Sequence, residues 1–148
     1  MPTITDALLL EHRFLLELFG EVERSLPEAA TVGEVRILAR LIERLLEDHA
    51  GAEKDLAYGA LDHVLYNERR LDRMHQDHHE IDDCLRRAQK VDILDEARRL
   101  LGTAIASSRD HFRREERQVF PLIERVLLSE TLVALGNARV GPGSARAA

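Results

Sequence analysis

The feature that most constrains the fold of this chain is the helical spacing of its apolar residues, with histidines and glutamates set into the same faces. The first series runs at intervals of three or four residues through Leu8, His12, Leu15, Phe19, Val22 and Leu26. Residues at this spacing share one face of an α-helix, so the series predicts an amphipathic helix with a histidine on its buried face. We expect this helix to begin near Thr3 or Thr5 and to end at about Ser25, because Pro27 follows.

A second helix is predicted from the sequence Thr31-Val-Gly-Glu34 onward, which has the form of a capping box. Its inward series comprises Val35, Leu38, Ile42, Leu45, His49, Leu56 and Ala60. The periodicity carries this helix to roughly Leu65, with a loosening at Gly59, because glycine weakens a helix interior. The second buried face therefore also carries a histidine.

Two more long helices and a short fifth one complete the predicted elements. Asn67 is a candidate N-cap for the third helix, which ends near Lys90, and Asp92 is a candidate N-cap for the fourth. Pro121 is expected to bend the far end of the fourth helix, and the fifth covers residues 129–139. The inward series are Leu71, Met74, His78, Ile81 and Leu85 in the third helix, and Ala97, Leu100, Ala104, His111, Gln118 and Leu122 in the fourth.

The fold class that follows is all-α, an up-down-up-down antiparallel four-helix bundle, because connections this short make neighbouring helices antiparallel. The chain has 148 residues, of which 45% are hydrophobic and 4% aromatic. One domain can therefore bury a core built mainly from aliphatic side chains. We place this domain at residues 1–139 and expect residues 140–148 to form a disordered tail, because they have little to bury.

Charge and cysteine content narrow the class of protein. The formal net charge is −6, and basic residues alternate with acidic ones, as in Arg113-Arg114-Glu115-Glu116-Arg117, which argues against a nucleic-acid surface. No stretch approaches the ~20 apolar residues that a membrane span needs, and the N-terminus lacks the basic and apolar regions of an export signal. The single cysteine, Cys84, cannot form an internal disulfide. The expected location is the cytoplasm, with neither nucleic acid nor membrane as a partner.

Two pairs of residues with the spacing His-x-x-x-Glu lie on the predicted buried faces. They are His49 with Glu53 and His111 with Glu115. Residues four apart sit nearly above one another on a helix, so each pair aims an imidazole nitrogen and a carboxylate oxygen at one point. Burying a carboxylate without a cationic partner costs several kcal/mol, and metal coordination offsets that cost. His12 is a further candidate ligand; taken alone, it would more simply be a core histidine hydrogen-bonded to the backbone, and the two His-x-x-x-Glu pairs favour the ligand.

The third helix offers three histidines, and their spacing leaves the choice of ligands open. His78 lies on the apolar series, His75 lies ~60° to one side, and His79 lies ~100° away. We assign His75 and His78 as ligands, with His75 and His79 as the alternative pair. His63 also lies on the second inward face, but it is about 20 Å along the axis from His49 and cannot join the same site.

Five histidines and two glutamates form the candidate ligand set, which is His12, His49, Glu53, His75, His78, His111 and Glu115. This set exceeds what one tetrahedral zinc uses, so it predicts two metal ions with bridging carboxylates, and iron, manganese or zinc suits such ligands. Glu116 lies ~140° around the helix from His111 and is expected to point away. Tyr58, Phe112 and Phe120 are assigned to the core or to the lining of the site.

This order of residues resembles the hemerythrin-like, HHE cation-binding family. The similarity rests on His12, on His49-x-x-x-Glu53, on the histidines of the third helix, and on His111-x-x-x-Glu115-Glu116 followed by Val119-Phe120-Pro121-Leu122. It covers about residues 5 to 135. Classical hemerythrins space the histidines of the third helix by four residues and place an Asp where this chain has Glu116. The His-x-x-x-Glu form matches the broader bacterial branch of the family.

The resemblance implies a four-helix bundle that holds two iron ions, bridged by two carboxylates and by an oxo or hydroxo group. One iron is left open for dioxygen in such a centre. By this resemblance the bridging carboxylates would be Glu53 and Glu115. The more open iron would be held by His12 and His49, and the other iron by His75, His78 and His111.

The function that the resemblance favours is the binding or sensing of dioxygen at this centre. One alternative is an enzyme that removes peroxide or nitric oxide at an open metal position, and another is an iron sensor or store in which metal binding drives folding. A metal-free helical interaction module would have to bury Glu53 and Glu115 without compensation. Dioxygen or another small oxidant is thus the expected partner, and the sequence indicates no particular protein partner.

Overall fold

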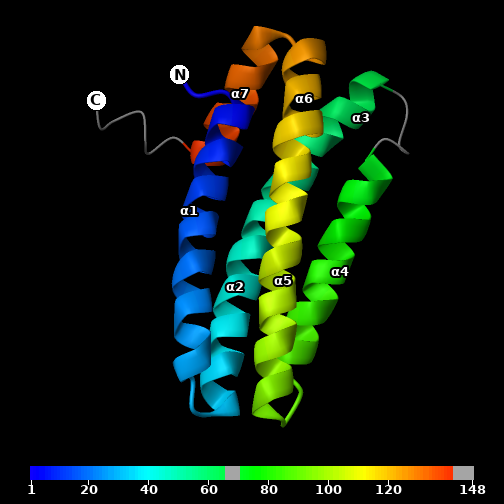
Figure 1. The fold of residues 1–148 in the computed structure, drawn as a ribbon. Coiled ribbons are helices and arrows are strands. Elements are labelled where there is room, and N and C mark those ends of the chain that lie inside the picture. The colour runs from blue at the N-terminus through cyan, green and yellow to red at the C-terminus, as the bar shows by residue number, and fades with distance from the viewer. Residues whose placement is uncertain (66–70, 142–148) are drawn as a thin grey trace.

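The computed structural model describes residues 1–65 and 71–141, which form helices joined by short connections. These two stretches contain no β-strand, so the prediction of an all-helical chain is confirmed for them. None of their helices is long and apolar enough to cross a membrane. The long helical rods lie side by side, and α7 folds back beside α1 (Figure 1).

The α-helices are interrupted by two π-helical segments. The α-helices are α1 (Ile4–Ser25), α2 (Val32–Ala52), α3 (Gly59–Leu65), α4 (Asp72–Ala88), α5 (Leu94–Arg114), α6 (Phe120–Val126) and α7 (Ser129–Val140). The π-helical segments are η2 (Glu53–Tyr58) and η4 (Glu115–Val119), and a 3-10 turn, η1 (Leu26–Glu28), follows α1. Because the backbone stays helical at both junctions of each π segment, α2, η2 and α3 form one rod, and α5, η4 and α6 form another.

Reciprocal side-chain caps fix the beginnings of α1 and α2 where the sequence predicted them. The Thr3 hydroxyl accepts a hydrogen bond from the backbone N–H of Asp6, and the Asp6 carboxylate accepts one from the N–H of Thr3. Thr31 and Glu34 form the same capping box at α2. Each cap satisfies backbone donors that the first turn of a helix cannot pair, which stabilises the helix by about 1 kcal/mol.

Of the caps predicted for the other two long helices, one is not formed and the other lies outside the described residues. Asp92 was expected to cap α5, but the cap position is Ile93, whose side chain has no group to accept a hydrogen bond. The Asp92 carboxylate instead accepts a hydrogen bond from Arg36 of α2 at 2.7 Å, which ties two rods together. Asn67, predicted to cap the third helix, lies outside the described residues, as do residues 142–148 of the predicted tail.

The buried face of α2 differs in detail from the predicted one. It runs through Val35, Ala39, Ile42, Leu46 and His49. Leu45, which the predicted series placed inside, is 38% exposed. The spacing from Ile42 to His49 can be divided as three plus four or four plus three residues, and only packing against α4 and α5 decides between them.

The segment η2 shifts the buried face of its rod by one residue. Leu56 and Ala60 were predicted to face inward, but they are only half-buried, whereas Ala57 and Leu61 are fully buried. A π turn holds one more residue than an α turn, so every position beyond it moves by one. The predicted loosening point, Gly59, is the first residue after η2.

The segment η4 causes the same shift in the second interrupted rod. Gln118 was predicted inside but is exposed, and the buried positions are Val119, Phe120 and Ile123. Pro121, predicted to bend this helix, lies within the first turn of α6. Proline has no N–H to donate and is tolerated at the start of a helix, so the wider turn ends where proline is acceptable.

Two apolar clusters fill the space between the rods and leave a polar layer between them. The cluster toward the α1–α2 and α4–α5 connections includes Leu15, Phe19, Ile42, Leu85, Leu100 and Phe112. The cluster toward α6 and α7 includes Ile4, Leu8, Leu61, Met74, Val119 and Ile123. Each large apolar side chain buried in this way contributes about 1.5–3 kcal/mol. The polar side chains between the clusters are thereby removed from water.

Candidate metal centre

His12 of α1 is fully buried between the two apolar clusters, with Leu8 and Leu15 one turn away on either side. Its ring stacks on the ring of Phe112, with centroids 3.9 Å apart and an angle of 11° between the planes. This packing directs Nε2 toward His49 of α2 and Nδ1 toward η4. His12 thus presents one ring nitrogen to the interior of the protein.

His49 and Glu53 bring the second rod to the same point. The Nε2 atom of His49 lies 3.0 Å from Nε2 of His12 and 2.7 Å from Oε1 of Glu53. Glu53 is the first residue of η2, and its side chain is fully buried. Two imidazole nitrogens and one carboxylate oxygen therefore converge from α1, α2 and η2.

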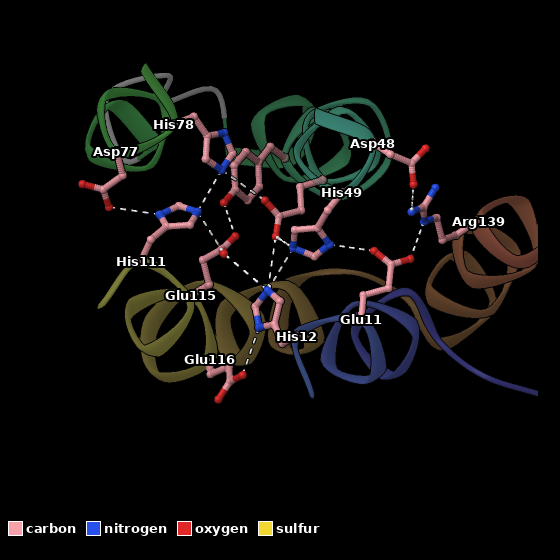
Figure 2. A network of polar contacts seen from close by, with 12 residues as sticks. Glu11, His12, Asp48, His49, Asp77, His78, His111, Glu115, Glu116 and Arg139 are labelled. Carbon is pink, nitrogen blue, oxygen red and sulfur yellow. Dashed lines mark hydrogen bonds and ion pairs between the residues drawn. The ribbon is translucent and has the colours of Figure 1, made fainter. Parts of the chain in front are cut away.

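The same arrangement recurs between α4 and α5. The Nε2 atom of His78 lies 2.8 Å from Nε2 of His111, which in turn lies 3.0 Å from Oε1 of Glu115. Glu115 is the first residue of η4 and is also fully buried. Figure 2 shows Glu115 between His111 and His12, so it connects this pair of histidines with the first one.

The ligand atoms form two groups that share one carboxylate. The first group comprises His12, His49, Glu53 and Glu115, and the second comprises Glu53, His78 and His111, with the ligand atoms of each group within 4.8 Å of one another. The Oε1 atom of Glu53 faces His12 and His49, and its Oε2 lies 3.2 Å from Nε2 of His78. Glu53 is thus placed as a carboxylate that spans the two groups of candidate ligands.

A carboxylate also holds the outer nitrogen of one ligand histidine in each group. The Nδ1 atom of His49 lies 2.6 Å from Oε2 of Glu11, and Nδ1 of His111 lies 3.0 Å from Oδ2 of Asp77. When Nδ1–H donates to a carboxylate, Nε2 keeps its lone pair for a cation and the ring cannot rotate freely. Glu11 and Asp77 therefore orient the rings toward the centre.

Glu116 was expected to point away from the site, and its side chain is indeed 38% exposed. It nevertheless contacts the site from outside, because its Oε1 lies 2.9 Å from Nδ1 of His12. The prediction considered only the angle between Glu116 and His111 on their own rod. The contact depends on the neighbouring rod, since Glu116 lies on the side of η4 that faces α1. Glu116 thereby orients His12 as Glu11 orients His49.

Arginines pair with the orienting carboxylates. Arg139 of α7 donates to Glu11 at 2.5 Å and to Asp48 at 2.6 Å, and Figure 2 shows it reaching across to both. On the opposite side of the centre, Arg114 contacts the Asp77 carboxylate. Burial raises the pKa of Glu11 and of Asp77, but contacts with histidines and arginines outweigh this and lower it, so both carboxylates are favoured in their ionised form. Through Glu11, α7 is linked to a ligand histidine of the centre.

The buried charges alter one another's protonation. Burial lowers the pKa of His12, but its contacts with Glu115 and Glu53 outweigh this and raise the pKa to about 9. Burial likewise lowers the pKa of His49, but Glu53 and Glu11 raise it to about 10. Burial raises the pKa of Glu53, yet His49 and His12 hold that pKa well below its ordinary range. In the metal-free protein, protons on the imidazoles balance the carboxylates, and a cation displaces those protons when it binds.

Two buried carboxylate oxygens fit a bound cation. Within the described residues, Oε2 of Glu53 and Oε1 of Glu115 are buried and accept no hydrogen bond of good geometry. They lie 3.2 Å from Nε2 of His78 and 3.0 Å from Nε2 of His111, respectively. A buried carboxylate oxygen without a partner is costly. A metal ion ligated by these nitrogens and oxygens would satisfy both, so the donor set fits metal binding.

A small cavity lies beside the ligand groups. It is bordered by three of the ligands, His49, His78 and His111, and otherwise by Leu46, Ala50, Ile81, Asp82, Ser108 and Phe112 of α2, α4 and α5. Its volume of about 20 Å³ is room for one water-sized molecule. Because most of the other wall is apolar, a small uncharged molecule can lie next to the imidazoles without loss of hydrogen bonds.

Comparison with protein families decides which class this site belongs to. The model of the hemerythrin HHE cation-binding domain matches residues 3–123. The chain belongs to the hemerythrin HHE cation-binding domain family. This confirms the resemblance inferred from the order of the candidate ligands. The matched segment ends within α6, so α7 lies outside it. Searches of curated proteins and of solved structures gave no significant match.

Six of the seven predicted ligands of this HHE domain come together in the two groups. They are His12, His49, Glu53, His78, His111 and Glu115. His75 belongs to neither group formed by the described residues, and its ring meets the ring of Tyr58 edge-on at 5.7 Å. Its role as a ligand stays a prediction. His79, the alternative partner, is exposed on α4. His63, which was predicted on the second inward face, is instead exposed on α3, because η2 shifts the register of the rod before it.

The orienting residues and Tyr58 were not recognised as functional from the sequence. Glu11 and Asp77 did carry a signal, because each directly precedes a candidate ligand, in Glu11-His12 and Asp77-His78. An acidic residue next to a ligand on one helix points toward the neighbouring rod, where it can meet a second ligand. Tyr58 carries a weaker signal, since it follows Glu53 by five residues and was assigned only to the core or the lining.

The two halves of the HHE domain repeat each other. The buried residues His49, Glu53, Ala57, Tyr58 and Leu61 have counterparts 62 positions later in His111, Glu115, Val119, Phe120 and Ile123, which are also buried. Glu11 and His12 have counterparts 66 positions later in Asp77 and His78. Each half thus supplies an orienting carboxylate, two histidines from neighbouring helices and the first glutamate of a π segment. Such a repeat suits a pair of cation sites.

Proposed function

We propose that this hemerythrin-like domain forms an antiparallel four-helix bundle that holds two iron ions and binds or senses dioxygen there. The observation that carries the proposal is the pair of ligand groups joined by Glu53. Imidazole nitrogens combined with carboxylate oxygens suit iron, and a shared carboxylate keeps two ions close together. The repeat of the two halves supports two ions rather than one.

The residues of this chain bind, orient and exclude water. The ligands would be His12, His49, Glu53, His78, His111 and Glu115. The orienting residues are Glu11, Asp77 and Glu116, which accept hydrogen bonds from outer ring nitrogens. Bound iron supplies a change of oxidation state and an open position for a small oxidant. The apolar clusters on both sides keep bulk water from the centre, which protects a reduced metal from unwanted reactions.

The cavity supports dioxygen as the ligand. It touches histidines of both groups and has an otherwise mainly apolar wall that includes Leu46, Ile81 and Phe112. Its volume of about 20 Å³ is room for one molecule of about the size of water. A charged ligand would lose hydration against the mainly apolar wall.

The test is the metal content of the chain together with its visible spectrum. Protein loaded with ferrous iron should contain about two irons per chain, as the two groups imply, and its absorption should change reversibly between deoxygenated and oxygenated buffer. His49→Ala should lose iron, whereas His63→Ala, at an exposed position on α3, should keep it. Iron-loaded protein without any oxygen-dependent change would contradict dioxygen binding. Retention of both metals in His49→Ala and in Glu115→Ala would refute the site.

Asp82 supports a second candidate function, the removal of peroxide. It lines the cavity together with His78 and His111, and burial raises the pKa of its carboxyl group. Peroxide is removed by disproportionation, in which one molecule is reduced to water and a second is oxidised to dioxygen. Breaking the O–O bond of the first requires a proton for the departing oxygen, and an acid with a raised pKa supplies one more readily near neutral pH. Iron-loaded protein should then consume peroxide, and Asp82→Asn should slow this reaction. Asp83→Asn is the matched control, because Asp83 is largely exposed on the same helix.

A further inference from the structure

The second ligand group has fewer donors than the first. Four residues contribute to the first group, whereas the second consists of Glu53, His78 and His111. The histidine predicted to complete it, His75, remains outside both groups in the described part of the chain. The ring that His75 contacts is that of Tyr58, which lies between His75 and the centre's carboxylate Glu115.

Tyr58 adjoins ligands of both groups. It is the last residue of η2, and only 1% of it is exposed. Its hydroxyl donates a hydrogen bond to Oε2 of Glu115 in the first group. Its ring lies nearly parallel to the ring of His78 in the second group, with centroids 6.1 Å apart and an angle of 12° between the planes. The phenol oxygen is therefore held next to the centre by contacts with two rods.

The internal repeat shows that packing does not require this hydroxyl. The counterpart of Tyr58 in the other half is Phe120, which is also buried and also follows its glutamate by five residues. Phe120 stacks on His12 at 5.3 Å, as Tyr58 stacks on His78. A bare ring fills the equivalent place, and a buried hydroxyl adds a desolvation cost. The hydroxyl of Tyr58 thus has a role beyond filling space.

We propose that Tyr58 is a further metal ligand, whose phenol oxygen completes the second group. When a cation binds, the O–H bond would break, the phenol oxygen would keep the electron pair and donate it to the metal, and the proton would pass to Oε2 of Glu115, its hydrogen-bond acceptor, while Oε1 of Glu115 stays available to the first group. No electron is transferred in this step. The assignment rests on the proposed metal centre, but it is independent of any reaction with dioxygen.

Ferric iron provides a probe that sees this ligand directly. A phenolate bound to ferric iron absorbs visible light through charge transfer, and resonance Raman spectra excited in that band show the ring vibrations of the phenolate. Imidazole and carboxylate ligands do not give those vibrations. The chain contains only two tyrosines, Tyr58 and Tyr66, so the vibrations can be assigned by two substitutions.

The experiment compares ferric wild-type protein with three variants, measuring iron content and the resonance Raman spectrum of each. Phenolate vibrations should be present in the wild type, in the matched control Tyr66→Phe and in His75→Gln. They should be absent from Tyr58→Phe, which should bind one of its two ions more weakly. Tyr58→Phe should still fold, because Phe120 occupies the equivalent position in the other half; a cooperative thermal transition checks this.

The outcomes separate the ligand assignment from the proposed function. Wild-type protein that binds two irons without phenolate vibrations would overturn the assignment and leave the two-iron proposal standing. Vibrations that persist in Tyr58→Phe would also overturn it. Wild-type protein that binds no metal after reconstitution would overturn both.

Discussion

At the scale of single residues, carboxylates outside the two candidate ligand groups hold the histidine rings in place. Glu11 accepts from Nδ1 of His49, and Asp77 accepts from Nδ1 of His111. A negatively charged acceptor makes the ring a better electron donor at Nε2 and fixes its orientation. Contacts of this kind also keep the rings of His49 and His111 turned toward the centre.

Replacing Glu11 by Gln should weaken metal binding by about tenfold, because the amide accepts a weaker hydrogen bond from His49 and no longer pairs with Arg139. Competition with a chromogenic chelator measures the affinity. Glu17→Gln is the matched control, since Glu17 is exposed on the same helix, and it should leave the affinity unchanged. Equal affinities of both variants would show that Glu11 does not tune the ligand.

Ligands within one helix could be predicted from the sequence, whereas contacts between rods could not. The direction of His12, His49 and His111 follows from ~100° of rotation per residue, which holds as long as the helix is regular. The contact of Glu116 with His12 and that of Tyr58 with Glu115 depend on how two rods are rotated against each other. Periodicity says nothing about that rotation.

At the scale of elements, the π segments explain both the site and the errors in the predicted register. The starts of α1 and α2 were predictable because their capping boxes are local. Beyond Glu53 and Glu115, however, the buried face moves by one residue. The residue types in these segments do not indicate a π turn, so the shift could not be predicted. Each π segment begins at a glutamate of the candidate site, which agrees with the frequent occurrence of such turns at functional sites.

Deleting Lys54, an exposed residue within η2, should turn the π segment into regular α-helix. Ala57 and Leu61 would then follow Glu53 at ordinary α-helical spacing and stay buried, so the fold should persist. The backbone around Glu53 would change, so metal affinity should fall by at least tenfold. Circular dichroism and thermal melting report the fold, and chelator competition reports the affinity.

A deletion in regular helix is the control for this prediction. Arg40 is an exposed residue in the regular part of α2, where no wider turn can compensate for a missing residue. Its removal therefore rotates the preceding part of the helix by ~100° relative to the rest. That rotation would expose Val35 and Ala39, and the protein should fail to fold cooperatively. A Lys54 deletion that unfolds as completely as the Arg40 deletion would contradict the role assigned to η2.

Gly136 lets α7 approach the start of α1 closely. A Cβ atom added at Gly136 would lie 2.2 Å from the carbonyl oxygen of Pro2 and 2.6 Å from the carbonyl carbon of Thr3. Gly136→Ala should therefore destabilise the protein by about 1–3 kcal/mol through overpacking. Gly102→Ala in α5 meets nothing within 4 Å and should instead stabilise by about 0.5–1 kcal/mol. Urea unfolding of both variants measures the difference, and equal effects would contradict the close approach.

At the scale of the whole molecule, the fold places a charged layer between two apolar clusters. The clusters supply the hydrophobic stabilisation, whereas the layer imposes a desolvation cost that its internal pairing offsets. In the metal-free protein, protonated His12 and His49 balance the charge of Glu53. A cation takes over that balance when it binds, so the stability of the metal-free and the metal-loaded protein should depend on pH in opposite ways.

The free energy of unfolding of the metal-free protein should fall as pH rises. The folded pKa values of His12 and His49 are about 9 and about 10, above the ordinary value of about 6.5. Such groups stabilise the fold fully below the ordinary pKa, and this contribution is lost as pH rises through the folded value. We expect a loss of up to a few kcal/mol between about pH 6.5 and about pH 10, measured by urea unfolding in the presence of a chelator.

Two comparisons assign this pH dependence to the buried layer. His49→Gln should reduce the slope, because one raised pKa is removed, whereas His63→Gln should keep it, because His63 is exposed and lies away from the centre. Metal should reverse the trend from about pH 5 to about pH 8, since a cation competes with fewer protons as pH rises and binds more tightly. A flat profile in the metal-free wild type would mean that the imidazoles are neutral in the folded state, and the buried carboxylates would then need another partner.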